Sequence, residues 1–176
     1  QDPSGSVVLT MRADVQQVAK DALGDREGSV VVMDPTTGAI LAMYSFPNFD
    51  PNLVATHDSG EAADVLDFLN AYPGKPLLTN AYQERYMPGS SFKVITTGIA
   101  LENGITDLDR QFGVETAYVP PQTTDPVQNY GGTACGGSMV EVFYRSCNIP
   151  FAQLAIELGP EKMVAGTEAW GIGEEI

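Results

Sequence analysis

The sequence predicts an α/β (α+β) domain in which helices pack around an antiparallel sheet. One observation is a hairpin pattern, in which two apolar runs at residues 29–33 and 39–44 flank the turn Asp-Pro-Thr-Thr-Gly at residues 34–38. The other is that most later segments repeat their apolar residues at helical spacing. Since the helices outnumber the strands available to them, we expect the sheet to be completed by strands beyond residue 176.

The N-terminal segment is expected to begin with a short strand at residues 7–10. A helix follows and ends at Gly24, because its apolar residues recur at helical spacing: Val15, Val18, Ala19, Ala22 and Leu23. Both strands of the hairpin are nearly continuous in apolar residues, so we expect each of them to be covered on both faces.

The middle of the chain is expected to be irregular at first and then helical. Residues 46–76 contain four prolines and an acidic cluster, with one short helix expected around residues 65–69. A clearer helix is predicted from Pro88 to Asn103, because Asn103-Gly104 is a typical C-terminal stop.

The last third of the chain is expected to alternate loop and helix. Residues 111–137 are rich in Pro, Thr and Gly, which predicts extended loop or short strands. Helices are predicted at residues 139–145 and 150–158, and a last one from Gly159-Pro160 to about residue 171. We therefore interpret residues 1–176 as one incomplete domain.

Charge and composition exclude several classes of protein. Asp and Glu outnumber Lys and Arg by 23 to 9, a formal charge of −14 that repels phosphate backbones, so no nucleic-acid partner is expected. Apolar residues make up 43% of the chain, which favours a packed core over disorder. The apolar runs are too short to span a membrane. The chain begins with Gln1 rather than Met, so we expect an excised piece of a longer protein.

Neither a metal nor a cofactor is expected. The single histidine, His57, excludes a multi-histidine metal site, and the two cysteines lack Cys-x-x-Cys spacing. Cys135 and Cys147 would form a disulfide in an oxidising compartment, and two buried thiols are an equal alternative. His57 is expected at the surface, and Trp170 in the core.

The most informative motif is Ser90-x-x-Lys93, preceded by Pro-Gly and followed by an apolar helix. If Ser90 opens a helix, Lys93 lies one turn on, with the two Cβ atoms about 5–6 Å apart on one face. A lysine whose pKa is lowered can take the serine proton, and free N–H groups at a helix start can stabilise an oxyanion. This spacing suits a Ser–Lys acyl-transfer site. The simpler alternative is a helix-capping serine beside a solvated lysine.

A second candidate element is Ser146-Cys147-Asn148, in a tight turn between two predicted helices. A hydroxyl and an amide at such a junction can share a proton relay and hold a substrate amide. The alternative is an ordinary junction of a C-cap and an N-cap, where Ser and Asn are common.

Together, Ser90-x-x-Lys93 and Ser146-x-Asn148 resemble the penicillin-recognising serine acyltransferases, in which S-x-x-K and S-D-N motifs occupy facing elements. The segments at residues 28–43 and 45–52 are similar to the opening hairpin of class B penicillin-binding proteins and its continuation. Ser-Cys-Asn is a variant of actinobacterial members. The resemblance covers nearly the whole chain and implies the penicillin-binding transpeptidase fold, which serine β-lactamases share.

The resemblance also implies a role for each site residue. Ser90 would attack a D-alanyl-D-alanine stem peptide and carry the acyl group, with its own N–H as one oxyanion donor, and Lys93 would be the general base. Ser146 would pass the proton to the leaving amine, and Asn148 would hold the donor peptide and orient Lys93. β-Lactams would acylate Ser90 covalently. The resemblance further implies that the reaction would need no cofactor and would take place at the extracytoplasmic face of the bacterial membrane.

The sequence departs from that family pattern in one respect. The third motif, Lys-Thr-Gly on an edge strand, is absent, because Lys20, Lys75 and Lys162 are not followed by Thr/Ser-Gly. We therefore expect the C-terminal remainder of the domain, and the N-terminal anchor usual in class B members, to lie outside this chain.

Two other functions remain open from the sequence. A serine β-lactamase shares both motifs but needs a water-activating glutamate; Glu157, Glu161 and Glu168 follow the Ser-x-Asn turn, and none has an Asn close downstream. A non-catalytic sensor or scaffold that binds penicillin without cross-linking is the other alternative.

Overall fold

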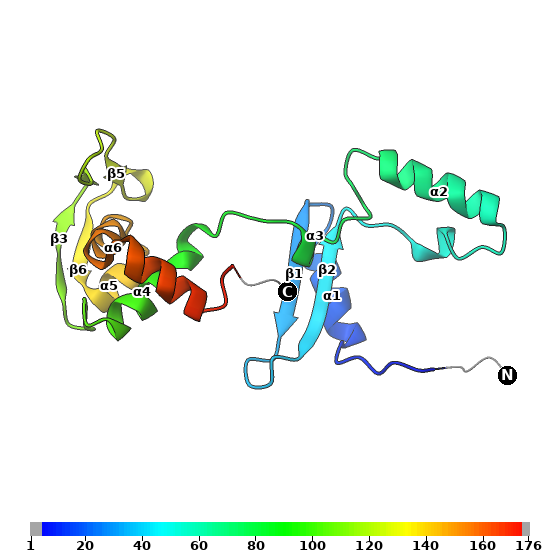
Figure 1. The fold of residues 1–176 in the computed structure, drawn as a ribbon, viewed down its shortest axis with the longest axis horizontal. Coiled ribbons are helices and arrows are strands. Elements are labelled where there is room, and N and C mark those ends of the chain that lie inside the picture. Colours follow the sequence, from blue (N-terminus) through cyan, green and yellow to red (C-terminus); the bar gives the residue numbers. More distant parts are fainter. Residues whose placement is uncertain (1–4, 174–176) are drawn as a thin grey trace. The chain divides into compact units, whose positions relative to one another are not determined.

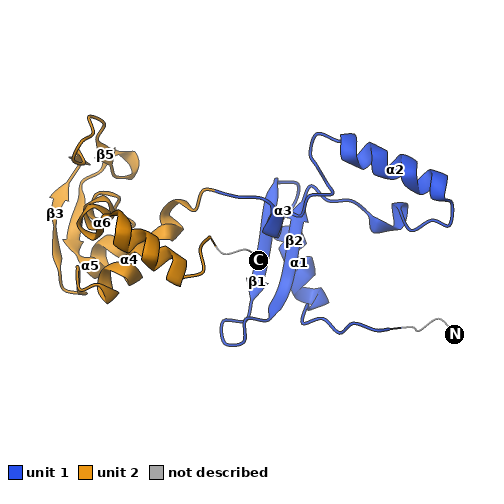
Figure 2. Cartoon of the chain, in the orientation of Figure 1, with its two compact units in different colours: residues 1–86 blue, residues 87–176 orange. Residues whose placement is uncertain are grey.

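The computed structural model describes residues 5–173 and divides the chain into two compact units, Gln1–Tyr86 (unit 1) and Met87–Ile176 (unit 2) (Figure 1, Figure 2). Its strands form three separate two-stranded antiparallel sheets, and each sheet lies within one unit. Among the described residues, no helix has both the length and the apolar character that a membrane span requires.

Unit 1 is built on the predicted hairpin. Its elements are α1 (Ala13–Leu23), β1 (Gly28–Met33), β2 (Ile40–Phe46), the 3-10 turn η1 (Pro51–Leu53), α2 (Ser59–Ala71) and α3 (Asn80–Gln83). Asp34 closes the hairpin turn by accepting the N–H groups of Thr36 and Thr37 on its Oδ1. Helix α1 packs against this sheet, and the Gln16 side chain exchanges two 2.8 Å hydrogen bonds with the Met43 backbone.

Two expectations for unit 1 were wrong, and a third is confirmed with different bounds. Residues 7–10 form no strand, because no described strand pairs with them along a ladder, and Val7 and Val8 are exposed. The hairpin is not covered on both faces, since Val31 and Met33 lie on one face and are 41% and 53% exposed. The short helix near residues 65–69 is longer than expected and begins after Asp58, whose side chain caps it.

Unit 2 holds a continuous hydrophobic core between helices and short strands. Its elements are η2 (Gly89–Ser91), α4 (Phe92–Glu102), β3 (Gln111–Glu115), β4 (Ala117–Tyr118), β5 (Val127–Gln128), η3 (Tyr130–Gly132), β6 (Cys135–Ser138), α5 (Met139–Tyr144) and α6 (Ile149–Ala169). Helices α4 and α6 pack together around Ile99 and Leu154, both fully buried.

The predictions for unit 2 are confirmed element by element. The helix after Pro88 ends at Asn103, and Gly104 follows in the left-handed region with φ 64°. The segment at residues 111–137 forms short strands, as expected. Helix α6 is interrupted at Gly159, which has φ 73° and ψ 166°, so the two helices predicted on either side of this residue are present.

Candidate active site

Ser90 lies at the exposed start of a helix, as its motif predicted. Gly89 has φ 55°, a left-handed conformation that lets the chain turn sharply into η2, and α4 follows directly. The Ser91 side chain, rather than that of Ser90, bonds back to the Pro88 carbonyl at 2.5 Å. Among the described residues the Ser90 hydroxyl has no hydrogen-bond partner, so the helix-capping alternative does not apply to it.

Lys93, on the first turn of α4, is half-buried and reaches the turn between α5 and α6. Its Nζ donates to the Ser146 carbonyl at 2.8 Å, to the Ser146 hydroxyl at 3.1 Å and to Asn148 Oδ1 at 2.7 Å. These three acceptors match the three N–H donors of an ammonium group. The structure therefore joins Lys93 of the first motif to Ser146 and Asn148 of the second, whereas no hydrogen bond among the described residues joins Lys93 to the Ser90 hydroxyl.

Burial lowers the pKa of Lys93 below the ordinary lysine value. The groups around Nζ carry no charge that would oppose this effect: they are Ser146, Asn148 and the ring of Phe151, whose centroid lies 5.4 Å away. A lowered pKa makes the neutral amine more accessible near neutral pH, and only the neutral amine can accept a proton.

Ser146 lies at the point where α5 ends, in a left-handed conformation with φ 57°. Its N–H donates to the Phe143 carbonyl, and the next N–H, from Cys147, donates to the Val142 carbonyl, both at 3.0 Å. These two bonds define a Schellman motif, in which the residue at the Ser146 position is usually glycine. A serine held in this conformation stores about 1–3 kcal/mol of backbone strain. This turn directs both Ser146 oxygens toward Lys93.

Asn148 stands at the N-terminus of α6 but does not cap that helix with its own side chain. Its Oδ1 accepts from Lys93, and its Nδ2 donates to the Gln128 carbonyl at 2.8 Å. The helix start is held instead by Asn129 Oδ1, which accepts the N–H of Asn148 at 2.8 Å and that of Ile149 at 3.3 Å. Sequence reasoning missed Asn129, because nothing in its local pattern distinguishes it from other loop asparagines.

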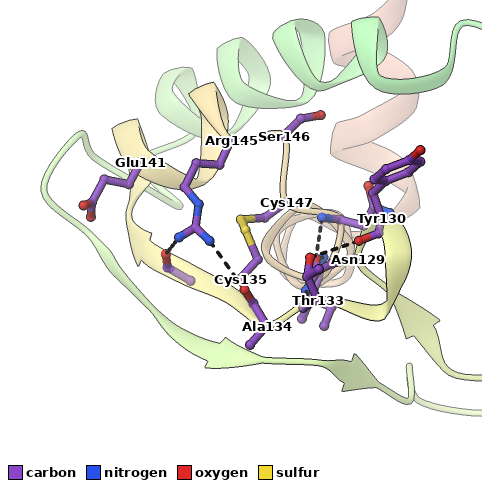
Figure 3. Close-up of a disulfide and its surroundings, with 12 residues drawn as sticks. Asn129, Tyr130, Thr133, Ala134, Cys135, Glu141, Arg145, Ser146 and Cys147 are labelled. Atoms are coloured by element: carbon purple, nitrogen blue, oxygen red, sulfur yellow. Dashed lines mark hydrogen bonds between the residues drawn. A yellow bond between two sulfur atoms is a disulfide. The ribbon is translucent and has the colours of Figure 1, made fainter.

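Cys135 and Cys147 form a disulfide, with their Cα atoms 5.7 Å apart (Figure 3). The alternative of two free thiols is therefore wrong. The bond joins β6 to the residue after Ser146, and both sulfurs belong to the buried core. It gives the turn between α5 and α6 a covalent attachment to the sheet beneath it.

The other residues that the sequence analysis singled out give mixed outcomes. His57 is exposed, as expected. Trp170, the residue that ends α6, is 48% exposed rather than buried, although its indole ring packs closely against Gly98 of α4. Glu157 binds Arg110 with both carboxylate oxygens, at 2.6 and 2.8 Å, so it is not free to activate water as a β-lactamase glutamate would.

This chain is similar to known proteins in both sequence and fold. Residues 28–176 match the family model described as the penicillin binding protein transpeptidase domain. The chain is 41% identical to the peptidoglycan D,D-transpeptidase PbpA of Mycolicibacterium smegmatis, and the match covers 97% of this chain and 37% of that protein. It is 39% identical to PbpA of Mycobacterium tuberculosis with the same coverage, so the chain spans well under half the length of these relatives.

Solved structures show the same similarity in three dimensions. The penicillin G acyl-enzyme complex of penicillin-binding protein A from M. tuberculosis superposes with a TM-score of 0.86 at 36% identity, covering 94% of this chain and 40% of that one. Pseudomonas aeruginosa PBP2, in complex with WCK 5153, gives a TM-score of 0.86 at 29% identity, covering 97% of this chain and 37% of that one.

Proposed function

Because this chain belongs to the penicillin-binding protein transpeptidase family, we propose that it forms part of a class B peptidoglycan D,D-transpeptidase that acts through a Ser90 acyl-enzyme. One observation carries the proposal. Lys93 follows the nucleophile by one helical turn and has all three donors bound to Ser146 and Asn148. The named activity of the PbpA relatives supports it.

In the proposed acylation step, the neutral amine of Lys93 takes the proton of the Ser90 hydroxyl as its oxygen attacks the penultimate D-alanine carbonyl. The N–H groups of the first helical turn, which have no partner within the helix, stabilise the oxyanion. Ser146, hydrogen-bonded to Lys93, passes the proton to the leaving D-alanine amine as the peptide bond breaks. The acyl group remains on Ser90 as an ester.

In the second step, the amine of a neighbouring stem peptide attacks this ester, forms the cross-link and returns the proton to Ser90. Asn148 orients Lys93 through Oδ1. Its Nδ2 has a second N–H with no partner among the described residues, and this group is available for the donor peptide's amide. A β-lactam enters the same first step and leaves a slowly hydrolysed ester.

The proposal extends to the parts of the protein outside this chain. Residues 1–176 form the N-terminal portion of one transpeptidase domain, whose C-terminal remainder carries the Lys-Thr-Gly strand. An N-terminal anchor holds the protein at the extracytoplasmic face of the membrane. The acidic surface and the disulfide agree with an oxidising extracytoplasmic location.

The test is the intact mass of the full-length protein before and after incubation with benzylpenicillin, with the adduct located by peptide mapping and Ser90→Ala as control. One stable adduct on Ser90, absent from the variant, is the expected result. Cross-linking of stem peptides then separates a transpeptidase from a sensor. Rapid turnover of a chromogenic cephalosporin would indicate a β-lactamase instead, and no adduct on an intact, folded protein would refute acyl transfer.

A further inference from the structure

Asn129 occupies an unusual position for a loop asparagine, because it is buried and uses its whole side chain. Only 5% of its surface is exposed. Its Oδ1 accepts two N–H groups, from Asn148 and Ile149, and its Nδ2 donates to the carbonyls of Glu115 at 2.9 Å and Thr133 at 3.0 Å. These four bonds are the full capacity of a carboxamide. The orientation of the Asn129 carboxamide is unambiguous. If its oxygen and nitrogen were exchanged, the NH2 group would face two N–H donors and the oxygen would face two carbonyl oxygens.

The two accepted bonds replace an ordinary helix cap. An asparagine at the N-terminus of a helix usually accepts an N–H from its own first turn. Asn148 does not, and the second residue of the helix is Pro150, which has no N–H. Asn129 lies nineteen positions earlier in the chain, and its Oδ1 accepts the N–H of Asn148 at the start of α6. It thereby takes the place of the missing side-chain cap. The Asn148 side chain is therefore released to accept from Lys93.

The two donated bonds fix Asn129 itself. They attach it to the end of β3 and to the loop that precedes Cys135. The disulfide then joins Cys135 to Cys147, on the other side of the same turn (Figure 3). The Ser146-Cys147-Asn148 turn is thus held by a covalent bond at its centre and by a buried carboxamide at its end.

From this arrangement we propose that Asn129 is a positioning residue for acylation, which acts by holding the Asn148 backbone so that the Asn148 carboxamide and the Ser146 oxygens converge on Lys93. It does not touch the reacting atoms. This inference rests on the proposed Ser90 acylation and adds a requirement that neither sequence motif contains.

The experiment measures the second-order rate constant of acylation by benzylpenicillin in the full-length protein, as a function of pH. Asn129→Ala is compared with the unsubstituted protein and with Asn80→Ala. Asn80 is the matched control, since it is also a buried asparagine, 7% exposed, whose side chain bonds a backbone carbonyl, that of Phe46 in unit 1. Rates are corrected for the folded fraction, read from thermal unfolding by circular dichroism.

We expect Asn129→Ala to lower the corrected rate constant by about tenfold to a hundredfold, the usual effect of displacing a reacting group by a fraction of an ångström to an ångström. Water admitted beside Lys93 should relieve its burial, so the rise of the rate with pH should move to higher pH. Asn80→Ala should keep both the rate and the pH profile.

Two results would overturn the inference. One is an unchanged corrected rate constant in Asn129→Ala. The other is a lower rate constant with the same pH profile as the unsubstituted protein, because that outcome indicates a structural role alone. If Asn129→Ala does not fold, Asn129→Ser is judged by the same two criteria, because its hydroxyl cannot make all four bonds. Failure of the unsubstituted protein to form an adduct on Ser90 would contradict the proposed function rather than the role of Asn129.

Discussion

At Ser146 the backbone and the side chain favour different amino acids. The left-handed conformation that ends α5 favours glycine, whereas the hydrogen bond from Lys93 uses a side-chain hydroxyl, which glycine lacks. A residue that costs stability in the fold but contributes an atom to the site is typical of functional positions. The strain at Ser146 is consistent with such a role.

Ser146→Gly and Ser146→Ala separate these two contributions. Both variants lose the hydroxyl, so acylation should fall sharply in each. Only the glycine variant relieves the left-handed conformation, so its free energy of unfolding should exceed that of the alanine variant by about 1 kcal/mol. Urea denaturation of the two proteins measures this difference. Equal stabilities would show that the conformation at this position carries no strain.

The lowered pKa of Lys93 predicts how stability depends on pH. Unfolded lysine titrates near pH 10.4, so between the lowered folded pKa and that value the unfolded chain binds more protons. The free energy of unfolding should therefore rise with pH across this window, relative to Lys93→Met, which cannot titrate. Denaturation of both proteins at a series of pH values checks the sign. A difference that stays constant with pH would mean that burial does not shift this pKa.

Among the structural elements, β6 and α5 form a segment closed at both ends by the Cys135–Cys147 disulfide, twelve residues apart. Closing a loop of this length removes unfolded-state entropy worth about 3 kcal/mol. The double variant Cys135→Ala/Cys147→Ala should lose about that much free energy of unfolding in urea. A reductant should lower the stability of the unsubstituted protein and leave the double variant unchanged, and an effect on both would point to another cause.

The pairing of β3 with β6 depends on a glycine. A methyl group on Gly136 would overlap the Gly113 carbonyl and come within 2.7 Å of Val114 Cα, and backbone atoms cannot move aside as side chains do. We expect Gly136→Ala to cost about 2 kcal/mol or more. Gly98→Ala is the matched control, since the atoms nearest to its methyl group belong to the half-exposed Trp170 ring, which as a side chain can shift. Thermal unfolding should show a clearly larger loss for Gly136→Ala than for Gly98→Ala.

Helix and hairpin positions could be predicted because their signals are local. The apolar periodicity and the stop at Asn103-Gly104 located α4, and with it Ser90 and Lys93. The strand expected at residues 7–10 failed because a strand depends on a partner that local sequence does not show. Asn129 was missed for the same reason, since its four partners lie up to twenty residues away. The capping box of Ser138 and Glu141, by contrast, has a local sequence signal, since Ser-x-x-Glu is the pattern typical of such a box.

On the scale of the whole molecule, buried apolar side chains are distributed unevenly between the units. Among the described residues of unit 1 only Ala19, Ala42 and Leu69 are buried hydrophobics, whereas unit 2 holds the continuous core. Helix α2 illustrates the difference, because Phe68 is 63% exposed while Ile99 of α4 is fully buried.

Local unfolding should be easier in unit 1, where fewer apolar side chains are buried. Amides of α2 should exchange hydrogen for deuterium faster than those of α4, because few buried contacts resist opening of α2. Hydrogen–deuterium exchange followed peptide by peptide measures both helices in one sample. Equal protection of α2 and α4 would mean that the two units open together as a single cooperative body.

The disulfide also has a consequence for how this molecule tolerates a broken backbone. Arg145, whose guanidinium donates to the Ala134 and Gly136 carbonyls, precedes Ser146 inside the ring that the two cysteines close. A protease that cuts after Arg145 hydrolyses one peptide bond yet releases no fragment, because the severed ends remain tied through sulfur. The cleaved protein stays in one piece until a reductant breaks the disulfide. Cleavage of the backbone at this position therefore does not by itself separate the two parts of the chain.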